Sequence, residues 1–387
     1  MIIVKFPKIG SHYIYVIPEF FLRSIRCYSP RSCSSREPMR AHLKPGVSLR
    51  AAAPSPKSSS NIVHPLGAAK PLSSVNIDRG RGALLGSAVG DALGAPFEFM
   101  APGTFRQRFP EPVLEGHGEM IGGGSFGWRP GEFTDDTQMA VIMAENILER
   151  RGIDPVSLWA NWQAWSQSAA DCGLLTSAAL SRSSWRGSAK AAHEQSGRSA
   201  ANGALMRVTG LALAYASAPL EEAIAAARYQ AQLTHYDPAA GWGAAIATAL
   251  IRAGIHDQDP LSELEAVLEL VAYEEREAFA SILSEAWHPD DESALANATV
   301  WTCLAQAVWA LRSSSSFEEA VVAAISLGHD ADTVACVTGA LAGSRYGLSA
   351  IPERWLAALH GEAVSAKGLR IYQRQNLIGL ADQLLAL

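Results

Sequence analysis

The chain has 387 residues and a formal net charge of −6, a balance that argues against general binding to nucleic acid or to an anionic membrane. Hydrophobic residues make up 48% of the chain, which is enough to build a large core, and its 32 glycines and 20 prolines are too few for a collagenous or low-complexity protein. Its five cysteines include no CxxC pair, which argues against a disulfide scaffold and a structural zinc site.

Residues 1–77 differ in charge from the rest of the chain. They hold eleven basic and two acidic side chains, a charge of +9, which leaves −15 for residues 78–387. Because this segment is rich in Ser, Pro and Arg, we predict a disordered leader. Its apolar run, residues 13–22, is interrupted by Pro18 and Glu19 and is shorter than the roughly 20 residues of a membrane span.

The composition of the leader resembles an organellar transit peptide. The alternatives are a start codon placed too far upstream, with translation beginning at Met39 or later, and a genuine functional tail. We expect a cytoplasmic protein, or an organellar one if the leader is a transit peptide.

From Asp78 onward, apolar residues recur at the three- and four-residue intervals typical of helices. The pattern predicts helices over residues 81–93, 139–150, 155–170, 203–217, 220–233, 241–253, 261–271, 294–312, 317–326 and 334–346. No series of alternating strands, no internal repeat and no linker follows residue 78. The sequence therefore predicts one all-α domain over residues 78–387.

Two short motifs combine carboxylates with threonine hydroxyls at the start of a predicted helix. They are residues 131–137 (GEFTDDT) and residues 328–333 (GHDADT). Asp and Thr are good helix caps, and negative charge is favoured in a first turn, so capping alone is one interpretation of each motif. A cap uses one side chain, however, and adjacent carboxylates repel each other unless a cation neutralises them.

Oxygen ligands without His or Cys favour hard ions such as Mg²⁺, Mn²⁺ or Ca²⁺ over zinc. Four carboxylates match two divalent ions about 3.5–4 Å apart better than one ion. The two motifs together therefore predict a metal centre.

The segments GALLGSAVGDALGAPFEF, FTDDTQMA and GHDADTVACVTGALAGSRYG resemble the ADP-ribosylglycohydrolase family. The resemblance is strongest to its bacterial branch, which includes dinitrogenase reductase-activating glycohydrolase, and runs from about Arg81 to Gly347. It implies a single large orthogonal helical bundle with two divalent cations, Mg²⁺ or Mn²⁺, in a cleft. The metal ligands that it implies are Thr134, Asp135, Asp136, Asp330, Asp332 and Thr333, with Asp332 as the bridge.

The resemblance also implies a reaction, the hydrolysis of the glycosidic bond at C1″ of an ADP-ribosyl group. A carboxylate near that carbon can stabilise developing positive charge or act as a base towards water. Glu98 is the first candidate, because it lies where related members place a metal-proximal glutamate. Asp171, in a DCG segment that matches a motif of the bacterial branch, is the second. The alternatives are a surface or capping role for Glu98 and a solvated loop for Asp171.

Glycine segments can bring backbone N–H groups close to the diphosphate. Gly123 lies in the GGGSF run before the first metal motif, and Asn202 and Gly203 open an NGALMR segment like the NGxxMR of the family. His235 occupies a position where members often carry histidine. These four residues are the candidate substrate-binding residues, although glycine also serves ordinary turns and a lone histidine is often structural.

The expected partner is an ADP-ribosylated protein, modified on arginine, or a small ADP-ribosyl conjugate. One alternative is a non-catalytic ADP-ribose-binding module with the same fold. Another is a dinuclear-metal phosphohydrolase, which would release phosphate or AMP.

Overall fold

The structure is a computed structural model that describes residues 2–8, 11–17, 62–67, 72–197, 199–290 and 296–387. It divides into two units, Met1–Lys57 and Ser58–Leu387. In the first unit, strands β1 (Ile2–Lys8) and β2 (Ser11–Ile17) form an antiparallel hairpin in which Ile2 faces Ile17. β-branched and aromatic residues favour such pairing, which the leader prediction did not include. Residues 18–61 and 68–71, on which that prediction also falls, lie outside the described residues.

Residues 62–67, which the sequence assigns to the leader, belong to the second unit and form a strap that packs against its residues 151–153 and Tyr215. Val63 and Ile153 exchange backbone hydrogen bonds of 2.8 and 3.0 Å. The Leu66 N–H donates to the Arg151 carbonyl at 2.8 Å, and the Tyr215 hydroxyl donates to the His64 carbonyl. Helix α1 then begins at Ser74, behind a capping box formed by Ser73 and Asn76. Ordered structure of the second unit therefore starts before Asp78.

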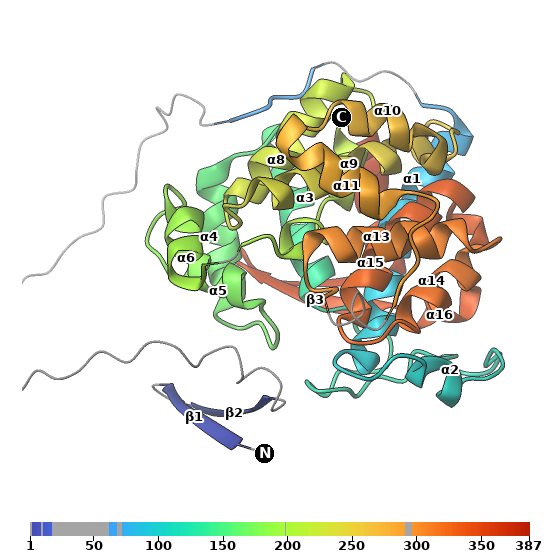
Figure 1. The fold of residues 1–387 in the computed structure, drawn as a ribbon, viewed down its shortest axis with the longest axis horizontal. Helices are drawn as coiled ribbons and strands as arrows, with labels where there is room; N and C mark the ends of the chain where they lie inside the picture. Colours follow the sequence, from blue (N-terminus) through green and yellow to red (C-terminus); the bar gives the residue numbers. More distant parts are fainter. Residues whose placement is uncertain (1, 9–10, 18–61, 68–71, 198, 291–295) are drawn as a thin grey trace, which may run out of the picture. The chain divides into compact units, whose positions relative to one another are not determined.

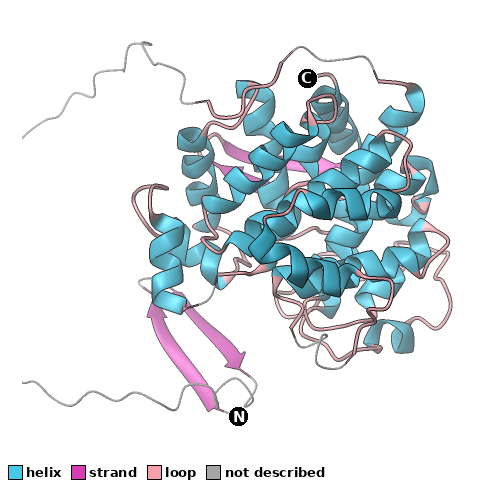
Figure 2. Ribbon diagram, turned by 45° about the horizontal axis from the view of Figure 1, so that its top comes forward, coloured by secondary structure: helices cyan, strands magenta, loops and turns pink. Residues whose placement is uncertain are grey.

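Helices make up most of the second unit (Figure 2). In the first part of the unit they are α1 (Ser74–Gly94), α2 (Thr104–Arg108), α3 (Asp135–Arg150), α4 (Pro155–Ser166), α5 (Leu174–Leu180), α6 (Ser188–Ser196), α7 (Thr209–Ala214) and α8 (Leu220–Gln232). In the second part they are α9 (Pro238–Ile255), α10 (Leu264–Glu269), α11 (Tyr273–Leu283), α13 (Val300–Arg312), α14 (Phe317–Ile325), α15 (Ala331–Tyr346), α16 (Glu353–Ala358) and α17 (Arg374–Leu385). Short 3₁₀ turns are η2 (Ala95–Phe97), η3 (Asn202–Ala204), η4 (Pro260–Glu263) and η5 (Leu348–Ala350). No helix of the described residues combines the length and apolar character that crossing a membrane requires.

The all-α prediction is confirmed, but two predicted helices are divided. The helix predicted over residues 203–217 is replaced by η3, a turn and α7. The turn places the side chain of Arg207 inside the protein. There its guanidinium donates to the Gln230 side chain at 2.7 Å and lies 4.2 Å from the Trp162 ring. The 261–271 segment likewise divides into η4 and α10.

Helices α1 and α15 pack antiparallel at backbone contact (Figure 1). A Cβ added to Gly86 would lie 2.3 Å from the Gly339 carbonyl oxygen, and one added to Gly90 would lie 2.0 Å from that of Ala335. At the end of α1, a Cβ on Gly94 would lie 2.5 Å from the Cα of Asp332. Because these positions lack side chains, the C-terminal end of α1 meets the N-terminal end of α15.

A small hairpin of strands β3 (His360–Ser365) and β4 (Gly368–Gln373), which the sequence patterns do not predict, fixes the chain before α3. The Phe133 N–H donates to the His360 carbonyl at 3.0 Å, and the His360 N–H donates to Gly131 at 2.9 Å. Gly131 has a φ of 80°, and a Cβ there would lie 2.1 Å from the Ala358 carbonyl oxygen. The first predicted metal motif is therefore fixed by backbone contacts to the segment that leads into β3.

Candidate functional site

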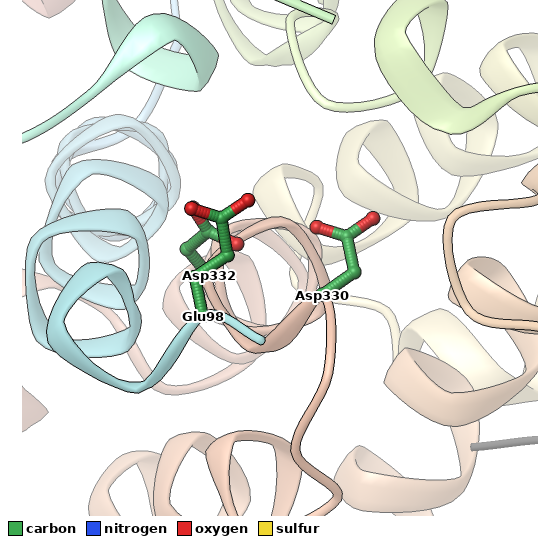
Figure 3. A group of neighbouring side chains, drawn as sticks. All are labelled: Glu98, Asp330 and Asp332. Atoms are coloured by element: carbon green, nitrogen blue, oxygen red, sulfur yellow. The ribbon is translucent and has the colours of Figure 1, made fainter. Parts of the chain in front are cut away.

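Three carboxylates meet where α1 ends and α15 begins. Oxygen atoms of Glu98, Asp330 and Asp332 lie within 4.8 Å of one another, although Glu98 is more than 200 residues from the other two. Figure 3 shows their carboxylates on the same side, with those of Glu98 and Asp332 close together and that of Asp330 beside them. Glu98 and Asp332 are buried, with 8% and 2% of their surface exposed.

The first motif joins the same site. The Thr333 hydroxyl lies 3.4 Å from an Asp136 carboxylate oxygen, which links the start of α15 to the start of α3. The charge of Asp330 also acts on Asp135 and Asp136. The structure therefore brings the two predicted motifs together. We refer below to the acidic cluster, which comprises Asp91, Glu98, Asp135, Asp136, Asp171, Asp330 and Asp332.

Asp91 is a member that sequence reasoning missed. It is fully buried on α1 and accepts hydrogen bonds from the hydroxyls of Thr134 and Thr137 at 2.7 and 2.6 Å. It also accepts from their backbone N–H groups, each at 3.0 Å. Asp91 therefore fixes the first turn of α3 to α1. The sequence signal that could have identified Asp91 is a lone charged residue in a helical segment, GALLGSAVGDALG, whose other residues are small or apolar.

Burial and mutual repulsion both disfavour charge in the cluster. Burial raises the pKa of Glu98, and the charges of Asp332 and Asp171 raise it further. Burial and neighbouring carboxylates likewise raise the pKa values of Asp135 and Asp332 well above their ordinary range. The pKa of Asp171, which is half-buried, rises to about 6, mainly through burial and then through Asp330.

The donor set fits hard divalent cations. Glu98 Oε2 and Asp136 Oδ1 are buried and have no hydrogen-bond partner among the described residues. Such atoms are costly unless something pairs with them. The Thr134 hydroxyl donates its proton to Asp91, so its oxygen remains available as an acceptor. These are the oxygen ligands that Mg²⁺ and Mn²⁺ prefer.

Three predicted substrate residues lie together beside the cluster. Asn202 donates from Nδ2 to Asp330 Oδ2 at 2.7 Å. A Cβ added to the neighbouring Gly203 would lie 3.1 Å from the His235 ring. His235 is buried, and burial and the charge of Arg207 lower its pKa to about 3, so this imidazole is neutral.

Gly123 lies on a loop that packs against the chain leading to Glu98. Its φ is 91°, it is exposed, and it exchanges backbone hydrogen bonds of 2.7 and 2.9 Å with Trp128. A Cβ on the next residue, Gly124, would lie 2.9 Å from the Ala95 carbonyl oxygen. An added Cβ at Gly123 itself would meet open space. The backbone at Gly123 is therefore accessible.

The raised carboxyl pKa values predict that metal-free protein is less stable at pH 8 than at pH 7. Folded Asp135, Asp136 and Asp332 keep their protons to a higher pH than the same residues of the unfolded chain, whose ordinary Asp pKa is about 4. The free energy of unfolding therefore falls as pH rises towards the folded pKa values. Histidines, with an unfolded pKa of about 6.5, contribute little in this window.

Thermal unfolding in the presence of a chelator tests this prediction. The midpoint should be lower at pH 8 than at pH 7, and added Mn²⁺ should raise it more at pH 8, where protons compete less with the metal for the carboxylates. A midpoint that rises with pH in chelator would contradict the assignment of raised pKa values.

The known proteins that this chain resembles have names that describe hydrolases of ADP-ribosyl groups. The sequence profile described as ADP-ribosylglycohydrolase matches residues 73–387. An ADP-ribosylarginine hydrolase, Tri1, of Serratia proteamaculans is 28% identical over 80% of this chain and 80% of its own length. The ADP-ribosyl-[dinitrogen reductase] glycohydrolase of Rhodospirillum rubrum is 28% identical over 73% of this chain and 90% of its own. A solved structure titled "ADP-ribosylglycohydrolase-related protein complex" superimposes with a TM-score of 0.64 at 32% identity, covering 81% of this chain and 100% of that one.

Proposed function

Since the chain belongs to the ADP-ribosylglycohydrolase family and is a hydrolase, we propose that it cleaves the glycosidic bond of an ADP-ribosyl conjugate and releases ADP-ribose. The conjugate is ADP-ribosyl-arginine on a protein or a small ADP-ribose derivative. The observation that carries this proposal is the convergence of buried carboxylates from the end of α1 and the starts of α3 and α15. That arrangement suits a reaction in which positive charge develops at a sugar carbon.

We propose further that the centre holds two divalent cations, Mg²⁺ or Mn²⁺. The residues that would hold them are Thr134, Asp135, Asp136, Asp330, Asp332 and Thr333. This set of ligands is supported by the buried Asp136 Oδ1, which has no hydrogen-bond partner among the described residues, and by the mutual repulsion of the carboxylates, which a cation would relieve. When bound, such ions hold sugar hydroxyls and lower the pKa of a coordinated water.

Glu98 is the first candidate for the carboxylate that acts at C1″. Its Oε2 is buried and unpartnered, and it lies beside Asp332 rather than on the surface. An ionised Glu98 would stabilise positive charge at the sugar carbon or accept a proton from the attacking water. Asp171 is the second candidate, because its pKa of about 6 suits proton exchange near neutral pH.

The rest of the substrate would lie along Gly123, Asn202, Gly203 and His235. The N–H of Gly123 donates to the Trp128 carbonyl, so a diphosphate would bind to the N–H groups that follow it in the loop, where no side chain of Gly123 intervenes. The neutral ring of His235 and the adjoining Gly203 can border the substrate without adding charge.

Product identification tests the proposed reaction. The full chain is incubated with ADP-ribosyl-arginine and with hydroxyl-linked ADP-ribosyl conjugates, in Mn²⁺, in Mg²⁺ and in chelator. We expect intact ADP-ribose as the product, with turnover reduced at least about 100-fold by the chelator, a loss comparable to that of one strong transition-state contact.

Each alternative predicts a different outcome of this experiment. Phosphate or AMP would indicate a phosphohydrolase. Binding of ADP-ribose without turnover of any conjugate would indicate a binding module, and either result would refute the proposed reaction.

A further inference from the structure

The turn before α15 holds two successive residues in the left-handed region. Gly328 has a φ of 72° and His329 a φ of 53°. The left-handed conformation costs free energy for a residue with a side chain, so contacts around His329 must hold it. On one side these contacts are backbone hydrogen bonds. The Phe99 N–H donates to the His329 carbonyl at 2.6 Å, and the His329 N–H donates to the Met100 carbonyl at 2.8 Å.

On the other side, the turn is clamped by Asn297. This side chain is 1% exposed. Its Nδ2 donates to the Gly328 carbonyl at 3.0 Å, and its Oδ1 accepts from the Asp330 N–H at 3.2 Å. The amide of Asn297 therefore bridges His329, because it is hydrogen-bonded both to the preceding residue, Gly328, and to the following residue, Asp330. Only a side chain with both a donor and an acceptor can make this pair of bonds.

Asn202 extends the clamp to the Asp330 carboxylate. Its Nδ2 lies 2.7 Å from Asp330 Oδ2 and 3.2 Å from the Asn297 carbonyl oxygen. The backbone N–H of Asn202 also donates to the Ala298 carbonyl at 3.1 Å. The side chain that holds the carboxylate is thus itself anchored to residues 297 and 298.

The clamp explains why Asp330 does not cap its own helix. Asp330 is the N-cap residue of α15, and an N-cap aspartate commonly turns its carboxylate back onto the first N–H groups of the helix. Here the Asp330 side chain makes no capping bond. It accepts from Asn202, is also hydrogen-bonded to the side chain of Thr333, and lies with Glu98 and Asp332.

We propose that Asn297 is a positioning residue, which with Asn202 keeps the Asp330 carboxylate out of the capping position and in the acidic cluster. The inference rests on the proposed metal centre. Without the amide of Asn297, the turn relaxes and the carboxylate rotates onto the N-terminus of α15. The helix then keeps a cap while the centre loses a ligand.

Mn²⁺ affinity tests the inference without depending on turnover. In the full chain, Asn297→Ala should weaken Mn²⁺ binding, measured by electron paramagnetic resonance or calorimetry, by about 10-fold or more, as is typical when a residue that orients a metal ligand is lost. Asn146→Ala is the matched control. Asn146 is 2% exposed, accepts from the Asp154 N–H at 3.0 Å and donates to the Ser157 hydroxyl at 2.7 Å, so it ties a turn far along the chain from α15. Its variant should bind Mn²⁺ as the wild type does.

Wild-type Mn²⁺ affinity in folded Asn297→Ala would overturn the inference. If that variant does not fold, Asn202→Ala decides, because it removes the bond to Asp330 and leaves the turn clamped. Weakened Mn²⁺ binding in Asn202→Ala supports the inference, and unchanged binding overturns it. Wild-type protein that neither binds Mn²⁺ nor releases ADP-ribose would refute the proposed function as well, so the two failures are distinguishable.

Discussion

Asp332→Asn is expected to reduce kcat/KM for an ADP-ribosyl conjugate at least about 100-fold, a loss of about 2.7 kcal/mol of transition-state stabilisation. Asp332 lies at the junction of α1 and α15, beside Glu98 and Asp330, and only 2% of its surface is exposed. The substitution preserves shape and removes one ionisable carboxylate from the group that Asp332 forms with Glu98 and Asp330. Mn²⁺ binding should weaken together with turnover.

The same variant should fold at least as well as the wild type when metal is absent. Burial and the neighbouring carboxylates disfavour the ionised form of Asp332, so a neutral amide removes repulsion. In chelator, its thermal unfolding midpoint should equal or exceed that of the wild type. A variant that is inactive because it is unfolded would therefore contradict the prediction, and so would a variant with full activity.

Asp257→Asn provides a matched control for the chemical change. Asp257 is exposed, pairs with Arg79 at 2.6 Å, and has a φ of 66°, a conformation that asparagine also adopts readily. Turnover and Mn²⁺ binding should not change in this variant. Asp257 is on the exposed side of the pair and Arg79 keeps its hydrogen bonds to the Gly254 and Ser344 carbonyls, so the stability of the variant should fall by less than about 1 kcal/mol.

Gly86→Ala is expected to cost about 3 kcal/mol of unfolding free energy. In an open helix, the change from glycine to alanine stabilises by roughly 0.5–1 kcal/mol. In α1, however, the new methyl group would lie 2.3 Å from the Gly339 carbonyl oxygen and 2.8 Å from the Phe317 ring. Backbone cannot rotate away as a side chain can, so α1 and α15 must separate, at the upper end of the usual overpacking cost of about 1–3 kcal/mol.

Gly379→Ala makes the same chemical change where there is room for it. Gly379 lies in α17, and an added Cβ there would meet nothing within 4 Å. Urea unfolding should show Gly379→Ala to be as stable as the wild type or more stable by up to about 1 kcal/mol. Equal losses in the two variants would show that the close contact between α1 and α15 is not what makes Gly86 necessary.

The two acidic motifs could be recognised in the sequence because the residues of each motif are close together along the chain. Asp135 and Asp136 are adjacent, and Asp330 and Asp332 are two residues apart, so each group is visible without a fold. Whether the two motifs lie close together in space depends on how α1 and α15 pack through their glycines. The spacing of residues along the chain does not show which helix faces pack together. The resemblance to a known family supplied that link.

Other parts of the site depend on contacts that no local pattern encodes. Asn297 follows no motif, and its role emerges only when the turn at His329 is placed against it. Arg207 is buried and donates to the Gln230 side chain, a contact that the NGALMR segment does not reveal. The β3–β4 hairpin was missed because a pair of six-residue strands gives too short an alternation to stand out.

The contacts of the strap, residues 62–67, and the packing of the α1 glycines against α15 bear on which methionine could start translation. After Met39, the next methionine is Met100, which lies beyond both Asp91 and Glu98. A polypeptide initiated at Met39 would keep the residues that pair with Ile153 and Arg151, and also the whole of α1. One initiated at Met100 would lack the partner that α15 packs against. Among the methionines, Met39 is therefore the last from which synthesis could begin and still yield a complete site.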